Sequence, residues 1–238
     1  MSKLAKEIPI EKIVARQVSL GQQSHRRETV YKKALDFPSI SISRETGSGE
    51  EEVVEELKRI LGWQVYDKNI VERIANNAAL NAKLVEAIDE RTRSEFRNWI
   101  KAVFQNSLIQ SDQYMRHLSE VILSIAKHGR AIIIGRGANF ILPKGQTLDV
   151  RIIAPLQHRA YYTADKLSID YEKAKRMVIY SDNERQAFLH KFFNRTEFDP
   201  LNYDVIINTG NMNYKTAARV IVEALCSKFA MKLENLKA

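Results

Sequence analysis

The chain has 238 residues, 45% of them hydrophobic and 28% charged, which is the composition of a globular protein with enough apolar side chains for a full core. Its length fits one α/β domain with a small appendage. A single cysteine, Cys226, excludes a disulfide framework and a cysteine-rich zinc site.

The N-terminal stretch, residues 1–37, is mixed in character and basic, and apolar residues at helical spacing predict a short amphipathic helix between Ile8 and Leu20. The first residues, MSKLAKEIPIEKIVARQ, carry a charge every few positions and lack the apolar segment of a secretory signal. No apolar run is long enough to span a membrane, so we expect a cytoplasmic protein without a membrane partner. This helical extension either packs on the core or binds a protein partner.

Pro38 marks a boundary, and the sequence after it changes character. The β-branched, alternating SISISRE predicts a strand. The segment that follows the glycines has its apolar residues on one helical face, and Gly62 is a stop signal for that helix. A second short strand, QVYD, comes next.

Nearly all of residues 69–127 has a helical pattern without proline, which predicts a long helical insertion between strands. Two strands follow in RAIIIGRG and LDVRIIAP, then a highly charged helical segment at 156–196. YDVIINTG predicts the last strand, and an amphipathic helix closes the chain. Five short apolar strands that alternate with helices predict a parallel sheet covered on both faces, within one domain at 38–238.

The first strand runs into a glycine turn and then a helix, which is an arrangement that binds phosphate. Gly47, Ser48 and Gly49 occupy this turn, where small residues let backbone N–H groups approach phosphate oxygens. A complete phosphate loop has the pattern GxxxxGK[ST], but here Arg44 takes the place of the first glycine and Glu50 that of the lysine. The loop alone is therefore a weak match.

The same turn has a purely structural interpretation. Ser48 and Glu51 have the spacing of a capping box, in which the two side chains satisfy the free amides at the start of a helix. Acidic residues in the first turn of a helix are also favoured by the helix dipole.

Five motifs, spaced along the chain and in the right order, resemble the cytidylate kinase-like family of P-loop nucleoside-monophosphate kinases. They are ISISRETGSGEEEVVEELKRILGWQVYDKNIVERIA, AIIIGRGANFIL, RIIAPLQHRA, AKRMVIYSDNERQAF and DPLNYDVIINTG. The resemblance covers residue 39 to about residue 230 and leaves the N-terminal extension outside. It implies the P-loop fold of these kinases: a five-stranded parallel core, a monophosphate-binding helical insertion at about 69–127 and a lid at about 156–196.

The resemblance also implies an activity, the transfer of a phosphoryl group from ATP with Mg2+ to a nucleoside monophosphate, with CMP or dCMP as the expected acceptor. Arg136, just past a strand, would hold the phosphate of the acceptor, because a guanidinium grips phosphate at two points. Arg159 would lie against the triphosphate or its base, and Arg185 would close over the transferred group. Asp182 could orient Arg185, or the two could form an ordinary surface pair.

Two further carboxylates are candidates for substrate binding, and neither belongs to a recognisable metal site of the protein's own. Asp67 ends the second strand, where it could contact the acceptor's ribose or a magnesium-bound water, or could cap the next helix. Asp204 falls where the related kinases have an acidic residue, although it could equally be structural.

Glu50 is the main argument against efficient catalysis. It places a negative charge where a lysine usually neutralises phosphate, and at about 4 Å such a charge is worth roughly 4 kcal/mol. Arg44 could supply the missing cation. Two functions stay open: an active kinase, or a catalytically weak nucleotide-binding sensor or scaffold with the N-terminal helix as its output. The net charge of +8 favours polyanionic partners. Basic residues interleaved with acids, without a nucleic-acid motif, weigh against nucleic acid as that partner.

Overall fold

The computed structural model describes residues 9–28, 38–88, 90–104 and 112–237. Five strands form one parallel sheet in the order β2-β3-β1-β4-β5, so the strand that precedes the glycine turn is the central one. The predicted fold class is confirmed. The strands are β1 (Ser39–Arg44), β2 (Gln64–Tyr66), β3 (Ala131–Ile134), β4 (Thr147–Ile153) and β5 (Val205–Asn208).

The helices follow the apolar periodicity of the sequence. Among the described residues, no helix has both the length and the apolar character needed to cross a membrane. The helices are α1 (Ile10–Glu28), α2 (Glu50–Leu61), α3 (Lys68–Asn76), α4 (Ala78–Glu86), α5 (Glu90–Val103), α6 (Gln113–Lys127), α7 (Ala138–Ile141), α8 (Leu156–Leu167), α9 (Tyr171–Phe193), α10 (Tyr214–Phe229) and α11 (Leu233–Leu236), with a 3-10 turn at Pro200–Asn202.

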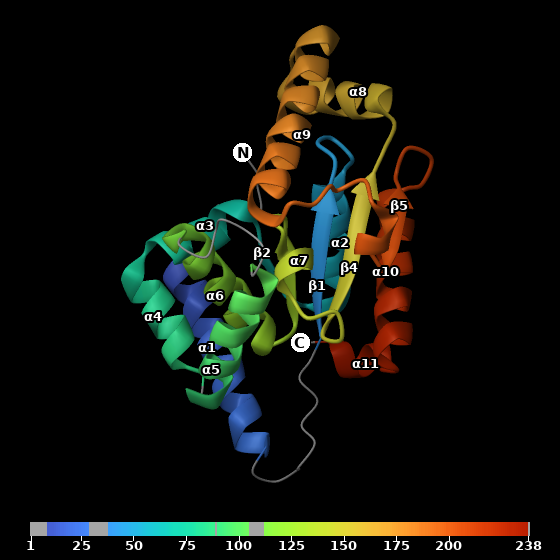
Figure 1. Cartoon of the computed structure of the whole chain (residues 1–238). Helices are drawn as coiled ribbons and strands as arrows, with labels where there is room; N and C mark the ends of the chain where they lie inside the picture. Colours follow the sequence, from blue (N-terminus) through green and yellow to red (C-terminus); the bar gives the residue numbers. More distant parts are fainter. Residues whose placement is uncertain (1–8, 29–37, 89, 105–111, 238) are drawn as a thin grey trace. The chain divides into compact units, whose positions relative to one another are not determined.

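The chain divides into two compact units. The first unit comprises Met1–Ile40 and Gln64–Thr147, and the second comprises Ser41–Trp63 and Leu148–Ala238. In the first unit, helices α1, α3, α4, α5 and α6 form a helical cluster (Figure 1). Strands β2 and β3 pair in parallel within this unit, with Val65 opposite Ile132.

Helix α1 is part of the core of the first unit. Val14 is buried, and the buried Gln17 donates a hydrogen bond from Nε2 to the carbonyl oxygen of Ile125 at 3.0 Å. The Tyr66 hydroxyl in turn donates to Gln17 Oε1 at 2.6 Å. These contacts support the packing alternative for the N-terminal helix. The helix runs beyond the predicted end at Leu20, and residues 29–37 lie outside the described residues.

In the second unit, α2 and α10 lie beside strands β1, β4 and β5, and α8 and α9 follow β4 as a helical hairpin (Figure 1). The charged segment that the sequence predicts as helical is two helices. Ser168, at φ 54°, ends α8, and the Asp170 side chain caps α9 by accepting a hydrogen bond from the backbone N–H of Lys173.

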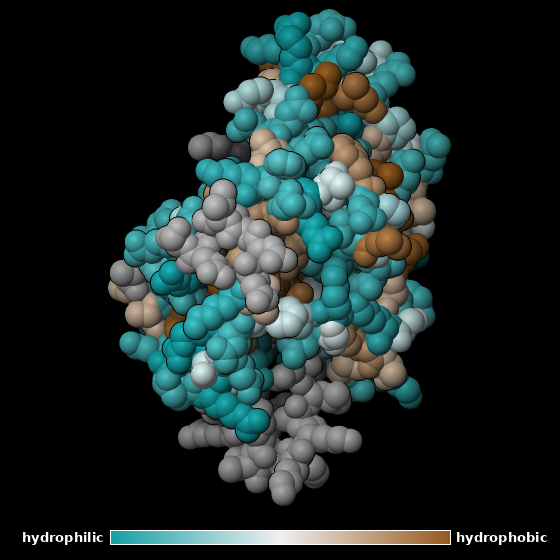
Figure 2. All heavy atoms as spheres, viewed as in Figure 1, coloured by the Kyte–Doolittle hydropathy of each residue, from teal (hydrophilic) through white to brown (hydrophobic). Residues whose placement is uncertain are grey.

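The face shown in Figure 2 is mostly hydrophilic, with hydrophobic residues at its upper end, in the region of the α8–α9 hairpin. Exposed large apolar side chains on these two helices include Tyr161 (58% exposed) and Tyr180 (68% exposed). Part of the apolar surface of the α8–α9 hairpin is therefore uncovered in the second unit.

Candidate nucleotide-binding site

The turn between β1 and α2 depends on its two glycines. Gly47 (φ 79°) and Gly49 (φ 74°) both adopt the left-handed conformation that favours glycine. A Cβ atom on Gly47 would lie 2.6 Å from the carbonyl oxygen of Arg159 and from Thr163 Oγ1, and one on Gly49 would collide with the Tyr214 ring. The turn therefore has a conformation and a packing on α8 and α10 that side chains at these positions would disrupt.

The capping-box interpretation of this turn is wrong. The N-cap of α2 is Gly49, which has no side chain, so no side chain caps the helix. Ser48 lies one residue earlier, and its hydroxyl donates to the carbonyl oxygen of Glu45 at 2.8 Å. Since the first N–H groups of a helix lack partners within the helix, the start of α2 retains the positive end that binds anions.

The three glutamates in the first turn of α2 each have a partner within the second unit. Lys166 and Tyr162 come from α8, so this helix supplies two of the three partners. Burial, reinforced by the Glu52 carboxylate, raises the pKa of the Tyr162 hydroxyl, which keeps it a donor. The pairs are Glu50 Oε1 with Arg44 Nε at 3.5 Å, Glu51 Oε2 with Lys166 Nζ at 2.9 Å, and Glu52 Oε1 with the Tyr162 hydroxyl at 2.5 Å.

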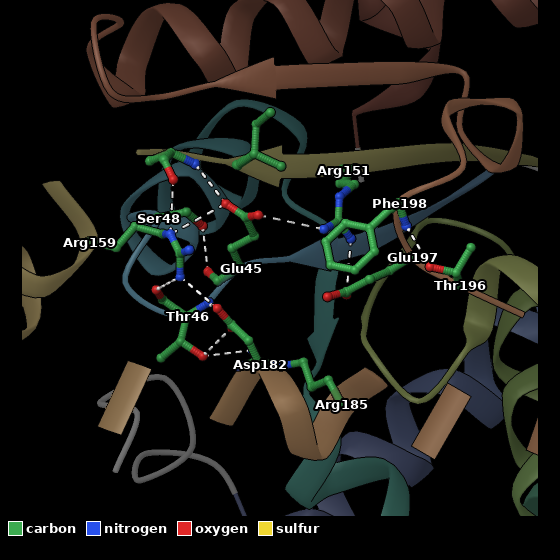
Figure 3. Close-up of polar contacts among 12 residues, drawn as sticks. Glu45, Thr46, Ser48, Arg151, Arg159, Asp182, Arg185, Thr196, Glu197 and Phe198 are labelled. Atoms are coloured by element: carbon green, nitrogen blue, oxygen red, sulfur yellow. Dashed lines mark hydrogen bonds and ion pairs between the residues drawn. The ribbon is translucent and has the colours of Figure 1, made fainter. Parts of the chain in front are cut away.

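Asp182 on α9 connects the turn with both helices of the hairpin (Figure 3). Its Oδ1 accepts hydrogen bonds from the backbone N–H and the hydroxyl of Thr46, both at 2.9 Å, and from Arg185 Nη1 at 2.8 Å. Its Oδ2 accepts from Arg159 Nη1 at 2.6 Å. Asp182 therefore does more than pair with Arg185 at the surface: it also binds Arg159, the other arginine that the sequence suggested, and Thr46 of the turn.

Arg159 and Arg185 differ in how many partners the protein itself provides for their guanidinium groups. Arg159 is 7% exposed and donates to Ala154 O at 2.9 Å and Thr46 O at 3.2 Å, and it pairs with Glu45 Oε2 at 3.3 Å. Arg185 Nη1 donates to Thr46 Oγ1 at 2.7 Å. Burial, followed by repulsion from Arg44, lowers the pKa of Arg185. Each of these two guanidinium groups has a carboxylate partner, Arg185 with Asp182 and Arg44 with Glu50.

A buried ion pair extends this set of contacts into β4 (Figure 3). Arg151 Nη1 lies 3.0 Å from Glu197 Oε2, and Arg151 and Glu197 are both 3% exposed. The Arg151 guanidinium also lies 5.7 Å from the centre of the Phe198 ring and 3.8 Å from Glu45 Oε1. Sequence reasoning missed Glu45, Arg151 and Glu197, although an arginine inside the apolar strand LDVRII was a signal that a buried carboxylate is near.

Arg136 belongs to the first unit and follows β3, with φ 52°. Its Nε lies 2.8 Å from Glu72 Oε1, and the Tyr114 hydroxyl donates to the same oxygen at 3.1 Å. Asp67, in the same unit, caps α3 by accepting a hydrogen bond from the backbone N–H of Ile70 at 2.8 Å, so the N-cap alternative describes its contact. Glu72 and Tyr114 were not predicted as part of a site.

Asp204 is not among the groups around the turn. It precedes β5, and its Oδ2 accepts from the backbone N–H of Asp149 at 2.8 Å and from Lys228 Nζ at 2.6 Å. Ligands of parallel sheets bind at the carboxyl ends of strands, whereas Asp204 lies at an amino end. These contacts support the structural alternative for Asp204.

A glycine turn after the central strand of a five-stranded parallel sheet, bonded to arginine-bearing helices, defines a P-loop kinase type of domain. The model of the cytidylate kinase-like family matches residues 39–211, and the chain belongs to this family.

Three proteins that the chain is similar to share 25% or less sequence identity with it. A uronate isomerase from Corynebacterium glutamicum is 25% identical over 149 residues, which are 58% of this chain and 29% of that protein, so the chain spans under a third of this curated relative. The crystal structure of an uncharacterized protein from Eubacterium ventriosum superimposes with a TM-score of 0.63 at 22% identity, covering 80% of this chain and 98% of that one. A shikimate kinase from Acinetobacter baumannii in complex with shikimate gives a TM-score of 0.42 at 14% identity, over 86% and 97%.

Proposed function

We propose that this protein binds ATP with Mg2+ at the β1–α2 turn and transfers the terminal phosphoryl group to a nucleoside monophosphate, with CMP or dCMP as the expected acceptor, in the cytoplasm. The observation that carries the proposal is the set of hydrogen bonds by which Asp182 holds Arg159 and Arg185 at Thr46 of the turn. Phosphoryl transfer needs little covalent help from the protein and depends on positioning and on neutralising charge.

The turn suits the phosphates of a nucleotide. The start of α2 has no side-chain cap, and the left-handed glycines direct the backbone through a tight bend. Backbone N–H groups at a helix N-terminus donate hydrogen bonds to phosphate oxygens. ATP supplies the phosphoryl group, and Mg2+ reduces the charge on its phosphate oxygens.

The arginines have distinct tasks in this proposal. Arg185, a neighbour of Arg44, neutralises the group in transfer, and Asp182 fixes its direction. Arg159 has four hydrogen-bond or ion-pair partners within the protein, and its task in this proposal is to position the turn and α8. In the first unit, Arg136 holds the phosphate of the acceptor, and Glu72 fixes its guanidinium in advance, which reduces the entropy lost on binding.

The alternative is a nucleotide-binding sensor or scaffold with little turnover. One contact favours this alternative. Glu50 stands where a complete phosphate loop has its lysine, and its Oε1 lies 3.5 Å from Arg44 Nε. Glu50 therefore partly neutralises the cation that would replace the lysine. Repulsion between the Glu50 carboxylate and a phosphate group, worth roughly 4 kcal/mol, would lower the rate of phosphoryl transfer by about three orders of magnitude.

The test is an assay of ADP release with CMP, dCMP, UMP and AMP as acceptors, run beside calorimetric titrations of ATP. ADP release that requires one of these acceptors supports the kinase. ATP binding without release in any combination selects the sensor. Absence of ATP binding, with retention on DNA that falls steeply with salt, would contradict both and indicate a nucleic-acid-binding protein.

A further inference from the structure

Helix α9 carries a stripe of side chains that has no part in the function described so far. Its members recur every three or four residues, so they share one face of the helix, and all of them are exposed within the described residues. This α9 stripe consists of Lys173, Arg176, Met177, Tyr180, Asn183 and Glu184. The buried residues of the helix lie on the opposite face and pack within the second unit: Ala174, Val178, Leu189 and Phe192.

The centre of the α9 stripe is apolar and open. Tyr180 is 68% exposed, and Met177, one turn before it, is 44% exposed. Tyrosine, methionine and arginine are enriched where proteins contact one another. Covering the Tyr180 ring and the Met177 side chain would remove apolar surface from water, which favours association.

The charges of the α9 stripe are arranged symmetrically about Tyr180. Arg176 lies four residues before it and Glu184 four residues after it, so each is about 6 Å from it along the helix axis. Within the described part of the chain, neither of these charges has an ion-pair partner. If a second α9 lies antiparallel with Tyr180 on the twofold axis, Arg176 of each copy meets Glu184 of the other. A symmetric interface requires this kind of self-complementary surface.

We infer that the α9 stripe is the interface of a symmetric dimer of this chain, with the two α9 helices antiparallel. A second copy supplies a partner for both charges, whereas a nucleic acid or an anionic membrane surface would repel Glu184. Asp182 and Arg185, two and five residues after Tyr180, lie on the opposite side of the helix at about 100° per residue. The dimer therefore leaves the contacts of the glycine turn in place, and the inference does not depend on the proposed function.

The experiment measures the mass of the full chain by sedimentation equilibrium over a series of concentrations without nucleotide. We expect the wild-type mass to rise from the 27.4 kDa of one chain toward twice that value. Arg176→Glu and Glu184→Arg each place like charges opposite each other, and each should raise the dissociation constant of the dimer at least tenfold. Arg219→Glu and Glu223→Arg make the same charge changes at exposed positions of α10 and should leave it unchanged.

Mixing the two variants tests the pairing itself. In a mixed dimer of Arg176→Glu with Glu184→Arg, opposite charges face each other at both contacts, so mixing should restore dimers. The double variant, which exchanges the two charges, should dimerise as wild type does. A wild-type mass that stays at 27.4 kDa would leave the α9 stripe to a different partner and overturn the inference. A dimer that both single variants retain, or single variants that stay monomeric when mixed, would overturn it as well, while the ADP-release assay tests the proposed function separately.

Discussion

The carboxylate of Asp182 accepts hydrogen bonds from both the backbone N–H and the hydroxyl of Thr46, each at 2.9 Å. One side chain on α9 thus fixes the orientation of Thr46, the second of the five residues between β1 and α2. Because the same carboxylate also binds Arg159 and Arg185, the position of these two arginines and the shape of the turn are determined together.

Replacing Asp182 by Asn should therefore lower turnover. The substitution keeps the shape but removes the charge from four hydrogen bonds, and a bond to a charged group contributes about 1.5–3 kcal/mol. We expect kcat to fall about tenfold to hundredfold, with a smaller change in the KM for ATP. Asp165→Asn, an exposed substitution on α8 with the same change in charge, is the control. Equal kcat values for the two variants would show that Asp182 does not position the arginines for transfer.

The glycines of the turn should be intolerant of even a methyl group. At φ 74°, Gly49→Ala costs roughly 1–2 kcal/mol in backbone conformation, and its methyl group collides with the Tyr214 ring. We expect a lower melting temperature and a loss of at least tenfold in ATP affinity. Gly145→Ala, where an added Cβ meets nothing within 4 Å, is the control and should leave both quantities unchanged. If Gly49→Ala binds ATP as wild type does, the turn does not hold phosphate.

Local pattern was sufficient to predict most of the fold. The five strands and the stop of α2 at Gly62 could be predicted because alternation, periodicity and a left-handed cap are properties of neighbouring residues. The break near Ser168 was not predicted, because a serine in the left-handed conformation has no distinctive sequence pattern.

The site was harder to predict, because its partners are far apart in the chain. The resemblance pointed to Arg159, Asp182 and Arg185, but nothing local connects Thr46 with a carboxylate 136 residues away. The capping-box spacing was misleading for a physical reason: a left-handed Gly49 takes the N-cap position, and Ser48 turns back into the loop.

Reversing the charge at residue 50 tests the kinase against the sensor. Glu50→Lys removes the ion pair with Arg44 and restores the lysine of a complete phosphate loop. We expect ATP affinity or turnover to rise at least tenfold, since the change replaces repulsion of the phosphates by attraction. Glu55→Lys on the exposed face of α2 changes the net charge equally and is the control. A fall in both ATP affinity and turnover would show that Glu50 has a positive role.

The hydrogen bond between Gln17 and Tyr66 predicts that α1 stabilises the first unit. Both side chains are buried, so Gln17→Ala leaves the Tyr66 hydroxyl without its acceptor, at a cost of about 1–3 kcal/mol. Burial raises the pKa of Tyr66, so the hydroxyl remains protonated and in need of that acceptor. Urea unfolding of Gln17→Ala, Tyr66→Phe and the double variant measures the coupling, which we expect to exceed about 0.5 kcal/mol. Strictly additive losses would mean that the contact contributes nothing.

Arg136 should act on the acceptor and not on ATP. Arg136→Ala is expected to raise the KM of the acceptor at least tenfold, because a charge-assisted bidentate contact to its phosphate is lost, with little change in ATP affinity. Glu72→Gln should reproduce part of this effect, since the guanidinium loses the carboxylate that holds it at 2.8 Å. Arg93→Ala, which removes a cation paired with Glu90 elsewhere in the first unit, is the control. An equal loss of affinity for ATP and acceptor in Arg136→Ala would assign this arginine to a general structural role, whereas an effect confined to the acceptor would place the monophosphate beside β3.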